Sequence, residues 1–216
     1  MTMRAARSLK RRVNLREPKR RFVIYTEGKN TEPDYFRAIR KASLGALIDI
    51  EIVEAAGVPA TIAKKASADA KARSRRGRAR SSFEETDEVW AVFDRDEHPH
   101  VEEALARCRA AKVGTAFSDP CFEIWLILHH GDFDRPDNRH EVQAECAKRC
   151  AGYDPKSGKT ADCDALMPLV AGAEKRAAAQ LARRMEEGNP PGAPLTTVFE
   201  LTRSIGEAHA AHQDAN

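Results

Sequence analysis

The stretch that decides the fold runs from Phe22 to Phe36 and reads FVIYTEGKNTEPDYF. Its first four residues are continuously apolar, which is typical of a strand buried on both faces of a sheet. A short polar turn follows, and Thr31 then begins a predicted helix, with Thr31 as its cap and Asp34 completing a capping box. A buried strand that leads directly into a helix predicts the first unit of an α/β sheet.

The same strand-then-helix order recurs three more times along the chain. Further strands are predicted at 48–53, 89–93 and 112–117, and helices at 59–73, 100–111 and 119–129, with Asp119 capping the last. Such alternation predicts a doubly wound, mostly parallel sheet. After Gly131 the pattern becomes helical, with helices predicted at 140–150, 161–187 and 195–210. We therefore expect an α/β core over residues 21–131 and a helical extension over 132–216 that packs on it.

The composition is that of a globular chain with a charged surface, because 42% of the residues are hydrophobic and 32% are charged. The longest apolar run, Ile124 to Leu128, is too short to cross a membrane. The basic N-terminus has no apolar segment after it, so it does not resemble a signal peptide. We therefore expect a cytoplasmic protein with no membrane partner.

Two segments concentrate positive charge. Residues 1–21 hold nine Lys/Arg against one Glu, and we expect residues 1–20 to be a disordered basic arm. Residues 64–80 hold eight Lys/Arg against one Asp. Both segments could attract the phosphates of a nucleic acid, although a solvated tail and a solvated helix face are the ordinary alternative. The candidate phosphate contacts are Lys29 in the first turn and Arg75, Arg76, Arg78 and Arg80 in the second basic segment.

Carboxylates follow two of the predicted strands directly. Glu27 comes after the first strand, and Asp94 and Asp96 come after the third. Ligands of open α/β sheets bind beyond the carboxyl ends of the strands, and these ends share one edge of a parallel sheet. Converging carboxylates repel one another without a cation, and oxygen ligands favour Mg²⁺ or Mn²⁺. The sequence thus predicts a metal site at Glu27, Asp94 and Asp96, whereas caps and solvated loop residues are the alternative.

Five cysteines are present, and none forms a closely spaced pair of the kind that zinc sites use. A zinc site would need Cys146, Cys150 and Cys163 with a fourth ligand such as His140. Reduced, partly buried thiols are the interpretation that we favour. His129 and His130 end a predicted helix, where they are either favourable charges at its C-terminus or a general acid or base.

Three segments together resemble the RloB-like family. They are residues 22–36 quoted above, residues 89–99 (VWAVFDRDEHP) and residues 118–129 (SDPCFEIWLILH). That family is similar to Toprim domains, which occur in topoisomerases, bacterial primases and the overcoming-lysogenization-defect nucleases. The resemblance covers roughly residues 20–160 and implies a Toprim-like version of the doubly wound sheet.

The resemblance also implies roles for individual residues. Glu27 would be the Toprim glutamate, and Asp94 with Asp96 its metal-binding pair. Glu32 and Glu123 correspond to further acids of the related nucleases, although Glu32 lies one residue further from Glu27 than in the usual pattern. Glu123 would be either a ligand of a second metal or a favourable charge at the N-terminus of its helix. Lys156 and Lys159 lie where those nucleases supply a catalytic lysine, and His98 stands where many Toprim domains have a third Asp.

These implications lead to a first hypothesis and two alternatives. The first is a Mg²⁺- or Mn²⁺-dependent nuclease that cleaves DNA or structured RNA as an anti-phage defence effector, as a homodimer and with an ATPase partner encoded nearby. No Walker sequence is present, so we do not expect the chain itself to hydrolyse ATP. One alternative is a non-catalytic nucleic-acid-binding or partner-binding subunit of a defence complex, and the other is a primase-like or strand-passing enzyme.

Overall fold

The computed structural model describes residues 20–43, 48–77, 87–95, 98–188 and 192–213. Strands and helices alternate over the first part of the chain, as the sequence predicts. In chain order they are β1 Arg20–Thr26, α1 Thr31–Ala42, β2 Ile48–Val53, α2 Pro59–Gly77, β3 Asp87–Asp94, α3 Val101–Ala110, β4 Gly114–Asp119 and α4 Glu123–His130. The later part consists of α5 Arg139–Arg149, α6 Cys163–Leu166, the 3-10 helix η1 Met167–Leu169, α7 Val170–Glu187, β5 Leu195–Thr196 and α8 Val198–Gln213.

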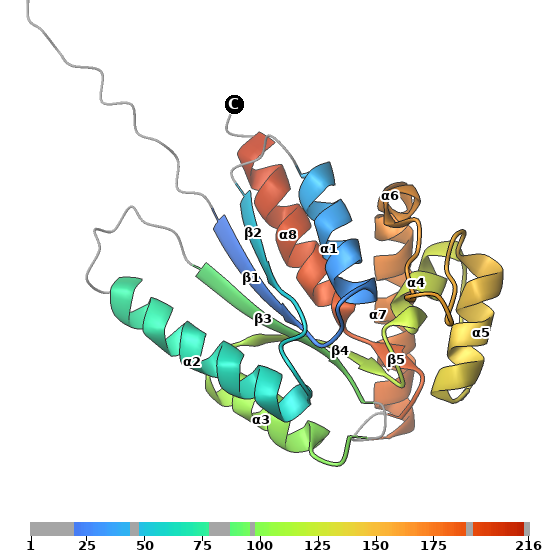
Figure 1. The fold of residues 1–216 in the computed structure, drawn as a ribbon, viewed down its shortest axis with the longest axis horizontal. Helices are drawn as coiled ribbons and strands as arrows, with labels where there is room; N and C mark the ends of the chain where they lie inside the picture. Colours follow the sequence, from blue (N-terminus) through green and yellow to red (C-terminus); the bar gives the residue numbers. More distant parts are fainter. Residues whose placement is uncertain (1–19, 44–47, 78–86, 96–97, 189–191, 214–216) are drawn as a thin grey trace, which may run out of the picture.

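The strands form one sheet in the order β2-β1-β3-β4-β5 (Figure 1). Every neighbouring pair is parallel except β4 and β5, which are antiparallel. The carboxyl ends of β1 and β3 therefore lie side by side at one edge of the sheet. The mostly parallel, doubly wound architecture expected from the sequence is confirmed.

Helices cover both faces of the sheet, and alternate residues of each strand pack against them. On β1, Phe22 and Ile24 join the larger core cluster, while Val23 joins the smaller one. The larger cluster lies beneath α1, α4, α7 and α8, and the smaller beneath α2 and α3 (Figure 1). The continuous apolar runs in the sequence thus reflect burial on both faces.

Three details of the predicted helices are wrong. Thr31 does not cap α1, because its hydroxyl donates a hydrogen bond to the distant carbonyl of Lys159, at 2.7 Å, and no side chain caps this helix. Asp119 ends β4 and pairs with Arg95 at 2.6 Å, so α4 begins only at Glu123. The segment predicted as helix from residue 195 starts as the short strand β5, which adds an edge to the sheet.

The domain boundary at residue 131 stays a prediction, but the later part contributes directly to the fold. β5 pairs with β4, and residues of α7 and α8 such as Ala177 and Leu201 belong to the larger core cluster. None of the helices in the described ranges is long and apolar enough to cross a membrane.

Candidate active site

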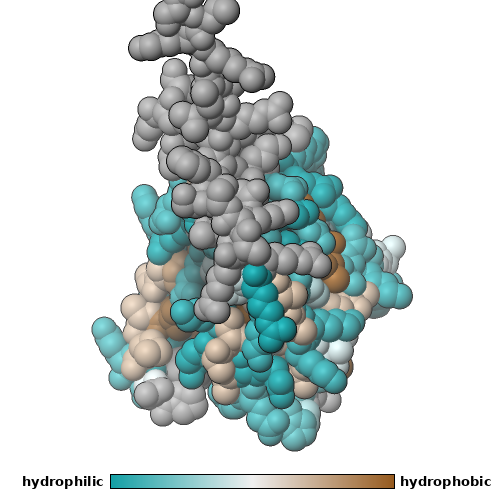
Figure 2. Space-filling view, turned by 90° about the vertical axis from the view of Figure 1, so that its left-hand side faces the viewer, coloured by the Kyte–Doolittle hydropathy of each residue, from teal (hydrophilic) through white to brown (hydrophobic). Residues whose placement is uncertain are grey.

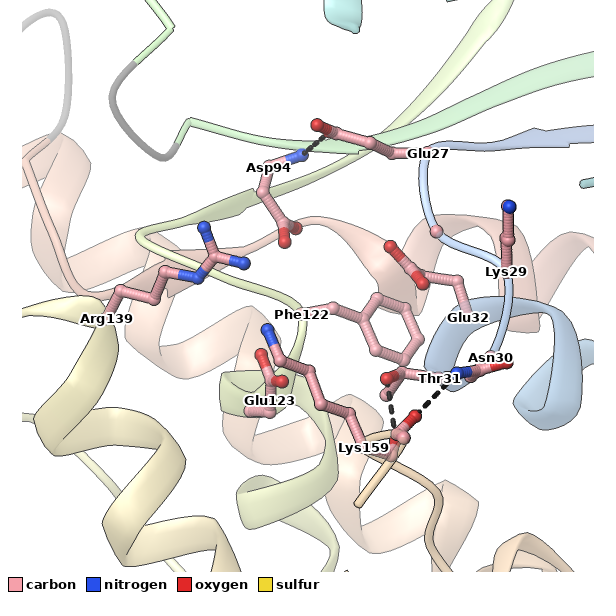
Figure 3. A pocket seen from close by; sticks show the side chains of 12 residues that line it. Glu27, Lys29, Asn30, Thr31, Glu32, Asp94, Phe122, Glu123, Arg139 and Lys159 are labelled. Atoms are coloured by element: carbon pink, nitrogen blue, oxygen red, sulfur yellow. Dashed lines mark hydrogen bonds between the residues drawn. The ribbon is translucent and has the colours of Figure 1, made fainter. Parts of the chain in front are cut away.

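A pocket lies at the carboxyl edge of the sheet, where β1 and β3 end (Figure 3). The turn between β1 and α1, the end of β3 and the start of α4 build one part of it. The start of α5 and the segment before α6 complete it. The lining residues are Glu27, Gly28, Lys29, Asn30, Thr31, Glu32, Asp94, Phe122, Glu123, Arg139, Gly158 and Lys159.

Three carboxyl groups come together inside this pocket, from Glu32, Asp94 and Glu123. Figure 3 shows the side chains of Glu32 and Asp94 extending into the pocket, with Glu123 on its opposite side. Glu32 and Glu123 are buried, with 7% and 4% of their surface exposed. The Oδ1 atom of Asp94 is also buried and has no hydrogen-bond partner. A buried carboxylate oxygen without a donor is costly, so the pocket holds more negative charge than the protein satisfies.

The pKa values of Glu32 and Asp94 reflect that imbalance. Burial raises the pKa of Glu32 to about 7, and the neighbouring charges of Glu123 and Glu27 add to the effect. Burial likewise raises the pKa of Asp94 well above its usual value, followed by the charges of Glu32, Glu123 and Glu27. Desolvation and like charges both disfavour the ionised form, and a proton or a bound cation relieves both.

Glu27 has a different environment from the other acids. Its Oε2 lies 3.4 Å from the backbone nitrogen of Asp94, and its Oε1 lies 3.0 Å from His98 Nε2. Because a carboxylate only accepts hydrogen bonds, His98 donates through Nε2. The Glu27 carboxyl group therefore lies along the strand ends, while that of Asp94 extends into the pocket (Figure 3). The two strand ends meet as predicted, but their carboxyl groups are not directed at a common point.

The donor types in the pocket, carboxylate oxygens, are those that a hard divalent cation prefers. In the described ranges, however, no group of three His, Cys, Asp or Glu side chains is placed so that it could hold a metal ion. Asp96, the third predicted ligand, lies outside those ranges. The partnerless Asp94 oxygen and the raised pKa values nevertheless match the carboxylate chemistry that Mg²⁺ and Mn²⁺ require. The metal site therefore stays a prediction, with Asp94, Glu32, Glu123 and Glu27 as its candidate ligands.

Gly28 lets the turn come close to Glu32. A Cβ atom at this position would lie 2.3 Å from Glu32 Oε2 and 3.2 Å from its Cδ atom. Any other residue would require the Glu32 carboxyl group to move, so the Glu-Gly pair in the first motif is consistent with the position of that group.

Of the two candidate lysines, only Lys159 reaches the pocket. Its backbone has a φ of 53°, which is uncommon for a residue other than glycine. Two hydrogen bonds hold this segment against the start of α1: Asn30 Nδ2 donates to the Gly158 carbonyl and the Thr31 hydroxyl donates to the Lys159 carbonyl, both at 2.7 Å. Lys156 is exposed and does not line the pocket.

Sequence reasoning missed several residues in and behind the pocket, among them Arg139, Gln143 and Tyr153. Arg139, the first residue of α5, lines the pocket. Gln143 and Tyr153 lie behind it, where the Tyr153 hydroxyl donates to Glu123 Oε1. The capping box formed by Asn138 and Glu141 could have located the start of α5. Nothing in the sequence, however, indicates that this helix meets the strand ends.

The predicted nucleic-acid contacts are not gathered at the pocket. Lys29 lies on its rim. Arg75 is exposed near the end of α2, and this helix returns from the carboxyl edge of the sheet to the opposite edge, where β3 begins (Figure 1). Arg78 and Arg80 lie outside the described residues, as do the side chain of Arg76 and residues 1–19 of the basic arm.

The surface on the α2 side is mainly hydrophilic. Figure 2 shows hydrophobic residues there only in scattered patches. The large hydrophobic side chains that are exposed among the described residues, Val58, Leu169 and Met185, come from different elements. This distribution gives no sign of a continuous apolar docking face.

His129 lies in the core and not in the pocket. Its Nδ1 is 2.9 Å from the Trp125 carbonyl, to which it must donate, so Nε2 accepts from the Tyr35 hydroxyl at 3.1 Å. Burial lowers the pKa of His129 to about 4. A neutral, doubly hydrogen-bonded ring supports a structural role, and His130 beside it is exposed and absent from the pocket lining.

All five cysteines are free and buried. Cys146 and Cys150 are neighbours at the end of α5, and the hydrogen bond between their thiols raises the pKa of Cys146 and lowers the pKa of Cys150. Across the described part of the chain, neither these thiols nor His140 belongs to a group of three donors that could hold a metal.

The comparisons with known proteins give one match. A model of the family described as RloB-like protein matches residues 22–205, which is most of the chain. The comparison with curated proteins found no match, and neither did the comparison with solved structures.

Proposed function

The chain belongs to the RloB-like family, and from this premise we propose that it is a Mg²⁺- or Mn²⁺-dependent nuclease that cleaves phosphodiester bonds of DNA or structured RNA. One observation carries the proposal: the buried, partnerless Asp94 oxygen lies at the carboxyl edge of a parallel sheet, among the carboxyl groups of Glu32 and Glu123. Such an unfavourable arrangement in a folded protein is explained if a cation completes it.

The residues of the pocket would have two distinct roles, metal binding and stabilisation of the leaving oxygen. Asp94, Glu32 and Glu123 would hold a divalent cation, joined by Glu27 and Asp96 from the adjoining strand ends. A bound divalent ion neutralises charge on the phosphate and lowers the pKa of bound water. Lys159, held by Asn30 and Thr31, would then stabilise the negative charge that develops on the leaving oxygen.

Several finer parts of the proposal are supported by the family resemblance alone. They are a role as an anti-phage defence effector, an ATPase partner, a homodimeric state and a cytoplasmic location. The basic arm and the second basic segment would add attraction for nucleic acid at positions away from the pocket.

A non-catalytic subunit of a defence complex is the second candidate function. The observation that favours it is the His98–Glu27 hydrogen bond, which holds the Toprim glutamate along the strand ends and away from the Asp94 carboxyl group. In that case the pocket would bind a metal weakly or not at all, and the chain would bind nucleic acid or a partner without turnover.

Cleavage assays with matched variants test the proposal. Purified protein is incubated with supercoiled plasmid and with total RNA, in Mn²⁺, Mg²⁺ or EDTA, with and without the ATPase encoded nearby. We expect metal-dependent cleavage that is lost in Asp94→Asn and Glu123→Gln and kept in Asp132→Asn, whose carboxyl group is 86% exposed. Unchanged cleavage by Asp94→Asn would refute the assignment.

Calorimetry with Mn²⁺ separates the two candidate functions. Metal binding that Asp94→Asn abolishes supports the nuclease. Binding of nucleic acid without metal binding, and without turnover under any partner condition, supports the non-catalytic subunit.

A further inference from the structure

The pocket has a basic side as well as an acidic one. Arg139 extends from the start of α5 and Lys159 from the segment before α6 (Figure 3). The Arg139 guanidinium is directed towards the Asp94 carboxyl group, and the Lys159 amine lies beside Glu123 (Figure 3). Neither residue is on the strand or the helices that carry the acids, so the basic side of the pocket is built from a later part of the chain.

A buried amide joins the two cations. Gln143 is one turn after Arg139 on α5 and only 6% exposed. Its amide oxygen accepts from Lys159 Nζ at 2.9 Å and from Arg139 Nε at 3.2 Å. The opposite amide orientation would give a 3.4 Å contact from Nε2 to Glu123 Oε1, but it would also turn an amide nitrogen towards two cations. Two charge-assisted hydrogen bonds are the stronger arrangement, and they fix the orientation.

Holding an arginine and a lysine on one oxygen atom brings two like charges together. In the metal-free pocket the carboxylates of Glu123 and Asp94 offset that repulsion. If those acids bind a divalent cation, the metal takes up part of their negative charge, so less of it remains to offset the two cations. A phosphodiester anion placed between the metal and the two cations would then be attracted from both sides.

We propose that Arg139 and Lys159, positioned by Gln143, form the seat for a phosphate group of the nucleic acid. This inference rests on the proposed function and names the side of the pocket that receives the substrate. The planar guanidinium of Arg139 can donate two parallel hydrogen bonds to the non-bridging oxygens, whereas Lys159 acts as a point charge. Gln143 is a positioning residue that touches the cations and not the phosphate.

Oligonucleotide binding without cleavage tests the seat directly. The full chain is titrated against a labelled DNA duplex and a labelled RNA hairpin across a salt series, in Ca²⁺ to occupy the acids and in EDTA as the reference. For Arg139→Ala and Lys159→Ala we expect about tenfold weaker binding of the preferred probe and a loss of about 1 from the slope of log K against log salt. Arg139→Lys should keep the slope and still bind more weakly, because its charge is retained but the fork is lost.

Two variants serve as matched controls. Lys156→Ala removes an exposed lysine from the same segment as Lys159, and Arg135→Ala removes an arginine with a 58% exposed side chain just before α5. Both should bind like the parent. The seat is refuted if Arg139→Ala matches the parent in affinity and slope, or if either control loses as much. Circular dichroism checks that each variant is folded.

Manganese calorimetry on the same variants distinguishes a failure of the nuclease proposal from a failure of the phosphate seat. Arg139→Ala should bind Mn²⁺ at least as tightly as the parent, since a positive charge near Asp94 has been removed. If the parent never binds Mn²⁺ but Arg139→Ala loses oligonucleotide affinity, the nuclease fails and the seat stands. If the parent cleaves and Arg139→Ala binds and cleaves equally well, the seat fails and the nuclease stands.

Discussion

The two ends of α4 lie in opposite polar environments. Glu123, at its start, faces a pocket in which the neighbouring Asp94 oxygen has no partner. His129, one residue before its end, has a hydrogen-bond partner for each ring nitrogen and belongs to a cluster with Tyr35 and Trp125. One end of the helix is therefore complete as the protein stands, and the other requires something further.

The difference separates structural from functional polar groups. Buried polar atoms are nearly always hydrogen-bonded, so a satisfied group such as His129 is explained by folding alone. An unsatisfied carboxyl oxygen beside other acids lowers stability and is explained by a ligand. The predictions below change one end of α4 or its surroundings while leaving the other intact.

The largest effect is expected for Asp94→Asn. The substitution removes a buried charge, so the metal-free protein should gain about 1 to 3 kcal/mol of stability. It should also lose the stabilisation by Mn²⁺, which for the parent amounts to about 2.7 kcal/mol at a hundredfold excess over Kd. Thermal unfolding with and without Mn²⁺ measures both, and Asp132→Asn is the control. If Mn²⁺ stabilises Asp94→Asn as much as it stabilises the parent, Asp94 is not a metal ligand.

The next effect concerns the other end of the helix and its pH dependence. Burial lowers the pKa of folded His129 to about 4, whereas unfolded histidine titrates near 6.5. Between these values the unfolded chain binds more protons, so stability falls as the pH drops from about 6.5 to about 4, by about 3 kcal/mol. His129→Gln should lack this component in denaturant titrations across that range, and His140→Gln, on the exposed surface of α5, should retain it. Parallel pH profiles for the parent and His129→Gln would show that the ring is not buried in neutral form.

A smaller effect is expected for Gly28→Ala. The added methyl group would overlap the Glu32 carboxyl group, and displacing that group should cost about 2 kcal/mol of metal binding, or about 30-fold in affinity. Mn²⁺ calorimetry measures the loss. Gly206→Ala, where a Cβ atom meets nothing within 4 Å, should leave affinity unchanged. Equal affinity in the parent and Gly28→Ala would mean that Glu32 is not a ligand.

The smallest effect is expected for Tyr153→Phe. It removes the hydroxyl that donates to Glu123 without changing the ring, and the loss of an outer hydrogen bond of this kind weakens metal binding by about tenfold. Tyr25→Phe, on the other face of the sheet, is the matched control, since its hydroxyl bonds Asp69. A loss as large as that of Asp94→Asn would indicate that Tyr153 supports the fold and not only Glu123.

The parts of the site that follow from local sequence were predictable. Glu27 and Asp94 follow continuous apolar strands, and parallel pairing brings their ends together whatever happens elsewhere in the chain. The Glu-Gly pair indicates a close turn, although only the structure shows that the Glu32 carboxyl group lies against Gly28. The resemblance to known nucleases added Glu32, Glu123 and Lys159, all of which line the pocket.

The remaining parts depend on tertiary contacts that have no local signal. Arg139 resembles any charged residue at a helix start, and its position in the pocket results from the packing of α5 against α4. Thr31 is a residue type that often caps helices, but its hydroxyl donates a hydrogen bond to the carbonyl of Lys159, 128 residues away. Asp119 likewise pairs with Arg95 and does not open a helix.

The two hydrogen bonds from Asn30 and Thr31 to the backbone of Gly158 and Lys159 have a practical consequence for dissecting the protein. A truncation ending near residue 131 would keep Glu27, Glu32, Asp94 and Glu123 of the pocket. It would lose Arg139, Lys159 and strand β5, and with them the two carbonyl groups that accept hydrogen bonds from Asn30 and Thr31. Separate expression of the two halves should consequently yield fragments that regain a working pocket only when mixed. Shortened versions are therefore poor substitutes for the intact polypeptide in any assay of its chemistry.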